Sequence, residues 1–185
     1  MTELAARHPH PERRPFTAPA PGPDRGDVIE LVLADHRRIR RLCQALDDAV
    51  LWTARSGASW APAHVWQRLA GLIEVHTLAE EEIWYPPASR SGPRATADIR
   101  EMAAAHDDIR EVIAEAALQP AGSALWWRAV RTVQAGICPH LDREERDTLA
   151  SWQRQLTSSR RLELGRQWTA FTAAWTLDTA QAAPR

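Results

Sequence analysis

Four histidines and two glutamates are the residues of this sequence whose types and spacing best suit chemistry. Four stretches of the chain carry apolar residues three or four positions apart, and each stripe is interrupted once by a histidine: His36, His76, His106 and His140. Glu80 follows His76 by four residues, and Glu144 follows His140 by the same interval. Side chains four residues apart share one face of a helix. Because a buried glutamate is costly unless it is paired, we expect a cation beside these carboxylates.

The connecting loops place the four histidines at one level of a helical bundle. Their distances from the middle of the connecting loops differ by only about 6–8 Å, at ~1.5 Å per helical residue. Imidazole suits iron, zinc and copper, and a carboxylate is a hard ligand that can bridge two cations. Four nitrogens and two carboxylates provide ligands for two metal ions about 3.5–4 Å apart. We therefore expect a dinuclear metal site with these ligands: His36, His76, Glu80, His106, His140 and Glu144.

A bundle without metal is the alternative interpretation of the same residues. A single histidine on an apolar stripe is more often a packed core residue than a ligand, and a single His-x-x-x-Glu pair can be purely electrostatic. Four inward histidines, two of them followed by glutamate, favour a metal site over this structural alternative. His64 lies off the apolar stripe, and we expect it at the surface.

The apolar spacing predicts helices throughout and gives no strand pattern. Helices are expected over about 27–55, from residue 62 to the pair Pro86 and Pro87, over about 93–118 and over about 123–156, with a fifth segment over 160–177. Asp27 is a plausible N-cap for the first of them. Because short connections force neighbouring helices to be antiparallel, the expected fold is all-α, an up-down-up-down four-helix bundle.

Three regions of the chain are expected to behave differently. Residues 1–26 hold six of the 13 prolines and no apolar periodicity, which predicts a flexible tail. Residues 27–157 form the expected bundle. Residues 158–185 are expected to form an amphipathic C-terminal helix and a tail, packed on the outside of the bundle or on a partner, for example in a homodimer.

Composition excludes several classes of function. All 23 basic residues are arginine, which rules out lysine-dependent chemistry, and the net charge of −1 gives no general attraction for nucleic acid. The longest run without a charged residue is 12 residues, against the roughly 20 that span a bilayer. The amino terminus lacks the apolar core of a secretory signal. We therefore expect a cytoplasmic protein that binds neither membrane nor nucleic acid. Cys43 and Cys138 form no C-x-x-C pair, so a disulfide framework or thiolate zinc site is not expected.

The sequences around the four histidines resemble those of the hemerythrin-like, or HHE cation-binding, domains. The strings that carry the resemblance are VIELVLADHR at 28–37, HTLAEEEIWYP at 76–86, AHD at 105–107 and HLDREE at 140–145. The resemblance covers about residues 27–150, and its four motifs stand in the order found in the family. The Glu-x-x-His pairs of ferritin-like proteins and the His-Glu-x-x-His motif of zinc hydrolases are both missing.

This resemblance implies a non-haem di-iron site in which the four histidines are ligands and Glu80 and Glu144 bridge two Fe ions. Members of the family bind dioxygen reversibly, sense oxygen, iron or redox state, or act on peroxide. The family's oxygen carriers have a second histidine one turn from the one matched by His106, whereas Met102 and Arg110 occupy those positions here. An additional open or water-filled metal position is therefore expected. It predicts a protein that binds and reacts with dioxygen or hydrogen peroxide, by peroxidase-, catalase- or oxidase-like chemistry. The alternative is a non-catalytic oxygen, iron or redox sensor that signals through the segment after Arg160.

Several residues near the motifs leave alternatives open. Pro139 removes a helical hydrogen bond just before His140, and we expect a kink or bulge there. Glu145 competes with Glu144 as the carboxylate ligand of that helix. Arg110 points either inward, toward a bound peroxide, or outward. Tyr85 either takes part in redox chemistry or packs at the end of its helix.

Overall fold

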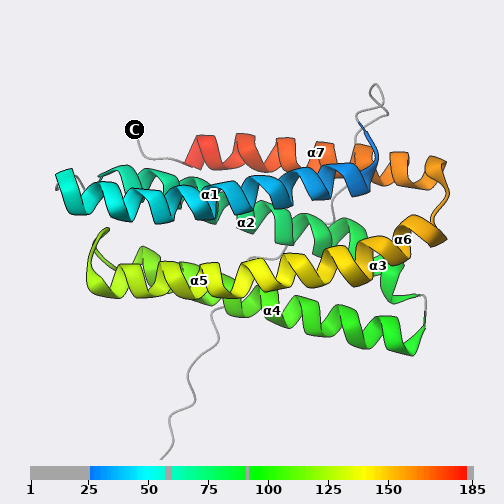
Figure 1. The fold of residues 1–185 in the computed structure, drawn as a ribbon. Helices are drawn as coiled ribbons and strands as arrows, with labels where there is room; N and C mark the ends of the chain where they lie inside the picture. Colours follow the sequence, from blue (N-terminus) through cyan, green and yellow to red (C-terminus); the bar gives the residue numbers. More distant parts are fainter. Residues whose placement is uncertain (1–25, 57–59, 91, 183–185) are drawn as a thin grey trace, which may run out of the picture.

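The computed structural model describes residues 26–56, 60–90 and 92–182, and the expected tail at residues 1–26 lies almost entirely outside this part. The prediction of an all-α fold is confirmed, because no strand occurs among the described residues. Long helices pack lengthwise into a bundle (Figure 1). In the part of the chain that is described, no helix combines the length and apolar character needed to cross a membrane.

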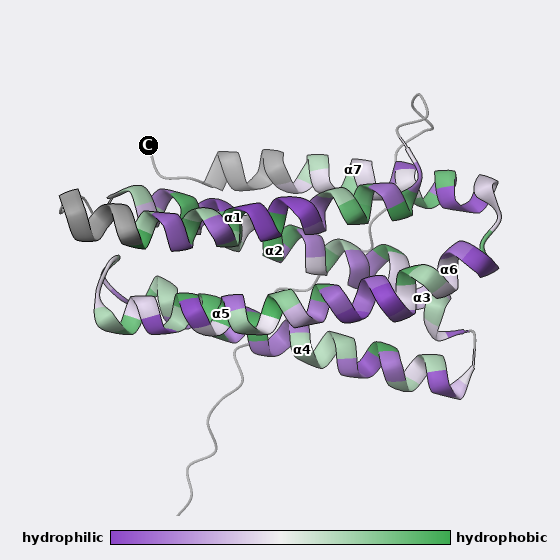
Figure 2. Cartoon of the chain, viewed as in Figure 1, coloured by the Kyte–Doolittle hydropathy of each residue, from purple (hydrophilic) through white to green (hydrophobic). Residues whose placement is uncertain are grey.

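Four long helices provide the frame of the bundle. α1 (Val28–Ser56) packs beside α2 (Trp60–Ala79), and α4 (Pro93–Ala117) packs beside α5 (Ala124–Arg143). The predicted N-cap is present, since the backbone N–H of Ile29 donates to Asp27 Oδ1 at 2.9 Å. Hydrophobic and hydrophilic residues alternate along these helices, as amphipathic packing requires (Figure 2).

Two of these helices continue through a π-helical segment. α2 leads into η1 (Glu80–Trp84) and then α3 (Tyr85–Ser89), while α5 leads into η2 (Glu144–Leu149) and then α6 (Ala150–Gln155). The prediction that the first of these helices ends at Pro86 and Pro87 is wrong. The N–H of Tyr85 still donates to the carbonyl of Glu80, and the prolines fall in the first turn of α3. Proline is tolerated there because that turn does not need its N–H.

Pro139 does not account for the π-helical segments. α5 includes Pro139, and the irregular turn of this helix begins only at Glu144. η1 has the same form, although Val75 stands before its histidine where α5 has proline. What the two segments share is a glutamate at their first residue, four positions after a histidine. π-helical turns occur frequently at functional sites.

The bundle has two apolar cores with the histidines between them. The first core includes Ile39, Leu46, Ile73, Ile109 and Ile137, and the second includes Val32, Trp84, Met102, Trp152 and Trp168. Along α4, for example, His106 lies between Met102 of the second core and Ile109 of the first. The polar layer is therefore enclosed by apolar side chains on both sides.

The C-terminal segment forms α7 (Ser158–Ala182), which packs on α1 and α2 of its own chain. Figure 1 shows it along α1, on the side away from α4. Its Leu164 and Trp168 are buried. Arg161 Nε donates to Asp27 Oδ2 at 2.6 Å, which ties α7 to the start of α1. α7 thus lies against two helices of its own chain, and its packing on a partner stays a prediction.

Gly165 provides the first test of this packing. A Cβ at Gly165 would overlap the carbonyl oxygen of Gly26, whereas a Cβ at Gly71 would meet nothing within 4 Å. We expect Gly165→Ala to lower the free energy of unfolding by about 1–3 kcal/mol, as overpacking does. The matched variant Gly71→Ala should raise it by about 0.5–1 kcal/mol, because alanine favours the helix. Urea unfolding of both variants checks this, and a Gly165→Ala protein as stable as wild type would contradict the close approach.

Candidate metal centre

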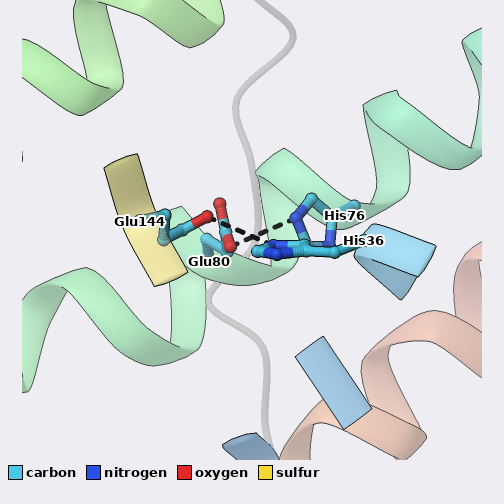
Figure 3. Close-up of side chains that lie close together, drawn as sticks. All are labelled: His36, His76, Glu80 and Glu144. Carbon is cyan, nitrogen blue, oxygen red and sulfur yellow. Dashed lines mark ion pairs between the residues drawn. The ribbon is translucent and has the colours of Figure 1, made fainter. Parts of the chain in front are cut away.

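Six side chains meet in the polar layer between the two cores. They come from α1, α2, η1, α4, α5 and η2, and they are His36, His76, Glu80, His106, His140 and Glu144. One donor atom from each of His36, His76, Glu80 and Glu144 lies within 4.8 Å of the others. Figure 3 shows these four side chains pointing toward one another. Glu80, His106 and His140 form a second group by the same distance limit. The structure thus brings together all six residues that the sequence singles out.

Glu80 belongs to both groups and lies between them. Its Oε1 is 3.2 Å from His76 Nε2, and its Oε2 is 3.3 Å from His106 Nε2. One oxygen therefore faces a histidine of the first group and the other faces a histidine of the second. A carboxylate in this position can serve two cations at once.

Glu144 has a comparable place on the opposite helix. Its Oε2 lies 3.3 Å from His36 Nε2 and 4.0 Å from His140 Nε2. Glu145, the competing candidate, is 32% exposed, and its Oε1 contacts the outer nitrogen of His36, Nδ1, at 2.9 Å. Among the two adjacent glutamates, Glu144 is the one whose carboxylate faces the cluster.

Most of the inward donor atoms have no hydrogen-bond partner. Buried polar atoms are nearly always satisfied in folded proteins. Among the described residues, the buried side-chain atoms of this cluster without a partner are His36 Nε2, His76 Nδ1 and Nε2, and both carboxylate oxygens of Glu80 and of Glu144. A cation would satisfy the inward-facing atoms, and a set of imidazole nitrogens and carboxylate oxygens suits iron or zinc. The residues present therefore fit a metal centre.

The electrostatics of the cluster also favour a cation. Burial and the charge of Glu144 raise the pKa of Glu80 well above its ordinary value. Burial lowers the pKa of His140 to about 4, so that its imidazole is neutral at pH 7. A metal needs neutral imidazoles and ionised carboxylates as ligands. The imidazole is already in the required state, and the carboxylate would gain most from an added positive charge.

Tyr85 is a site residue whose position the sequence did not predict. Its hydroxyl lies 3.2 Å from His106 Nε2, and its ring stacks on that imidazole with centroids 5.6 Å apart. The sequence predicts a helix that ends at Pro86, and it leaves two roles open for Tyr85: redox chemistry, or packing at the end of that helix. The helix instead continues through η1, and this turn directs the phenol into the second group.

The structure also shows where the side chains of Met102 and Arg110 lie, one turn before and one turn after His106 on α4. Met102 is buried, and the hydroxyl of Thr148 lies 3.5 Å from its sulfur. Arg110 Nη2 donates to Glu81 Oε1 at 2.8 Å and to Asp107 Oδ1 at 2.7 Å. The guanidinium is therefore held on the outer side, which is the outward alternative.

α7 covers one edge of the cluster. Trp168, which is 2% exposed, meets the ring of His76 edge-on with centroids 5.5 Å apart. The spacing of Trp168 within its helix predicted only that its face is apolar. His64, by contrast, is exposed on α2 as expected.

Comparison with known proteins identifies one family. The model described as the Hemerythrin HHE cation binding domain matches residues 27–151. Comparisons with curated proteins and with solved structures gave no significant match. The matched range includes all six residues of the cluster, and α7 lies beyond it.

A substitution at Glu80 tests whether the cluster depends on a cation. In metal-free protein at pH 7, Glu80→Gln should raise the free energy of unfolding by about 1–3 kcal/mol, the range for a buried polar group without a partner. The reason is that Glu80, whose pKa is raised, must at pH 7 either carry a buried charge beside Glu144 or take up a proton, and glutamine avoids both costs. The same variant should lose the stabilisation that added iron(II) gives to the wild type. Urea unfolding with chelator and with iron measures both effects.

The matched control is Glu74→Gln, an exposed carboxamide substitution on α2. It should leave the free energy of unfolding within about 0.5 kcal/mol of the wild-type value, both with chelator and with iron. A metal-free Glu80→Gln protein that is less stable than wild type would mean that the Glu80 carboxylate stabilises the fold without a cation.

Proposed function

Since this chain belongs to the family of hemerythrin HHE cation-binding domains, we propose that its buried cluster holds two iron ions. His36, His76, Glu80 and Glu144 would hold one ion, and Glu80, His106 and His140 would hold the other. The observation that carries this proposal is the partition of one cluster into two donor groups that share Glu80. Its unpartnered nitrogens and oxygens are the support for a bound cation.

We further propose that the centre reacts with dioxygen or hydrogen peroxide. Bound iron supplies the capacity to exchange electrons with such small oxidants. The second donor group has three members where the first has four, and this difference supports an accessible ligand position on the side of His106 and His140. Met102 and Arg110 add no donor on that side, because one is a buried thioether beside Thr148 and the other is paired outward.

The residues of the chain would control protons and water around a bound oxidant. Burial, Glu80 and Glu144 raise the pKa of the Tyr85 phenol, so that Oη keeps its proton at neutral pH. This hydroxyl can donate a hydrogen bond beside His106. The buried indole of Trp168 limits access of water to the edge of His76.

A sensor is the second candidate function, and the contact of Trp168 with His76 is the observation that favours it. This contact joins the cluster directly to α7, which lies outside the matched family range. A change in the position of His76 would act on the packing of α7. Turnover separates the two functions, because a sensor changes only its own state.

Metal analysis of two variants tests the proposed iron site. Wild-type protein from iron-supplemented cells should contain about two irons per chain. His76→Ala should lose this iron and lower the melting temperature, because the remaining buried ligands lack their cation. His64→Ala, at an exposed position of the same helix, should retain wild-type iron. Zinc alone in the wild type, or iron retained in His76→Ala and lost in His64→Ala, would reject the site.

Reaction with oxidants tests the proposed activity. The iron(II) protein should be oxidised in air with a spectrum that does not revert when the gas is removed, and the iron(III) protein should decompose hydrogen peroxide in excess over protein. Tyr85→Phe should keep the iron and lower turnover by roughly 10²-fold, the loss typical of a missing proton donor. A spectrum that reverts under vacuum, without peroxide turnover, would assign the protein to the sensor or carrier class.

A further inference from the structure

The cluster is flanked by two copies of one arrangement of side chains. In each copy a histidine and an arginine one turn later lie on one helix, and a pair of adjacent glutamates lies at the start of a π-helical segment. The first copy consists of His36 and Arg40 on α1 with Glu144 and Glu145 on η2. The second consists of His106 and Arg110 on α4 with Glu80 and Glu81 on η1. The sequence carries the same signature twice, as His-x-x-x-Arg on two helices and His-x-x-x-Glu-Glu on the other two.

The contacts of the two copies agree closely. Glu145 Oε1 is 2.9 Å from His36 Nδ1 and accepts a hydrogen bond from Arg40 Nη1 at 2.7 Å. The second nitrogen of Arg40, Nη2, donates to Asp142 Oδ1 at 2.6 Å. The guanidinium is thus held by two carboxylates, and one of them also faces the histidine.

The second copy repeats these contacts on α4 and η1. Glu81 Oε1 is 3.0 Å from His106 Nδ1 and accepts from Arg110 Nη2 at 2.8 Å. Arg110 is held in addition by Asp107 at 2.7 Å and by the hydroxyl of Thr77 at 3.2 Å. In both copies the arginine therefore has at least one further hydrogen-bond partner besides the glutamate.

Adjacent glutamates serve different purposes because of their directions on the helix. Successive side chains on a helix point about 100° apart. Glu80 and Glu144 are fully buried in the cluster, whereas Glu81 and Glu145 are partly exposed and reach the outer nitrogen of a histidine on a neighbouring helix. One residue of each doublet thus faces the inside of the layer and the next faces its rim.

We propose that Glu81 and Glu145 are positioning residues that fix the proton of His106 and His36 on Nδ1 and leave Nε2 with the lone pair that would bind a metal. In His106 this nitrogen lies 2.9 Å from His140 Nε2 and 3.2 Å from Tyr85 Oη, either of which can donate to it in the metal-free protein.

A carboxylate held by arginine only accepts hydrogen bonds, so the ring nitrogen hydrogen-bonded to it must carry the hydrogen. In both histidines that nitrogen is Nδ1, at 2.9 and 3.0 Å, whereas Nε2 lies 3.3 Å from the nearest carboxylate oxygen of Glu144 or Glu80 and makes no hydrogen bond to it. A neutral imidazole has one N–H, and its other nitrogen, Nε2, then presents a lone pair to the cluster. Arg40 and Arg110 hold the two carboxylates in place through hydrogen bonds of 2.7 and 2.8 Å.

This assignment gives each donor group one oriented histidine. His36 belongs to the first group and His106 to the second. His76 lacks this support: Asp35 is 3.9 Å from its Nδ1, and that nitrogen has no hydrogen-bond partner among the described residues. The effect on metal binding rests on the proposed function, whereas the position of the proton does not.

Nitrogen-15 NMR of histidine-labelled, metal-free, full-length protein tests the position of the proton. In the wild type, His36 and His106 should both be protonated at Nδ1. Glu81→Ala should change the tautomer of His106 and leave His36 unchanged, and Glu145→Ala should do the reverse, so that each variant is the control for the other. Glu81→Gln should retain the wild-type tautomer, because its amide oxygen still accepts a hydrogen bond. Protonation of His106 at Nε2 in the wild type, or no change in Glu81→Ala, would overturn the assignment.

Titration with iron(II) measures the consequence for the metal. Glu81→Ala and Glu145→Ala should each weaken binding by roughly 10–100-fold, the usual effect of removing a carboxylate behind a histidine ligand. Glu82→Ala, which removes an exposed charge from the same segment, should bind as the wild type does. A wild type that binds no metal but has the expected tautomers rejects the proposed function and retains this inference. A wild type that binds iron, with affinity unchanged in both alanine variants, rejects the inference and retains the function.

Discussion

Donor oxygens of Glu80 and Glu144 lie within 4.8 Å of each other, both residues are fully buried, and this pair of buried carboxylates is the constraint on which the rest of the structure depends. Two buried charges of the same sign are among the most costly arrangements in a protein interior. Their neighbours compensate them unequally. Against the effect of burial, the close contact and charge of His36 lower the pKa of Glu144 to about 2, whereas burial and the charge of Glu144 raise the pKa of Glu80. The proposed cation would therefore offset the cost of these buried carboxylates, and its binding would be coupled to folding.

The rest of the bundle can be understood as the support of this layer. Apolar cores on both sides of the layer pack the helices together, and each π-helical segment begins at one of the two buried glutamates. Each segment also places a second glutamate at the rim, where an arginine of a neighbouring helix holds it. The chain contains no lysine, and both of these cationic side chains are arginines. The planar guanidinium offers several N–H donors in a fixed arrangement, so it can hold two carboxylates at once better than an ammonium group can.

The sequence was sufficient for the parts of the structure that depend on one helix at a time. Apolar spacing within each helix identified the inward histidines, and a spacing of four identified Glu80 and Glu144. The remaining site residues depend on relations between helices. Tyr85 turns inward because η1 continues a helix that Pro86 was expected to end, and Glu145 faces His36 across a separation of 109 residues. The indole of Trp168 contacts His76 from α7, a helix that closely approaches Gly26 at Gly165. No local pattern encodes such contacts, although the repeated Glu-Glu doublets were visible in the sequence.

The helix that approaches Gly26 at Gly165 also comes from a different stretch of the chain than the donors it covers. The chain leaves the ribosome from its amino terminus, and every residue of the cluster precedes η2's last turn, whereas Trp168 follows it. The six donors are therefore synthesised before the indole that lies against His76. The donor set and the cover of His76 thus come from separate stretches of the chain, so the cover of that histidine can change while all six donors stay in place.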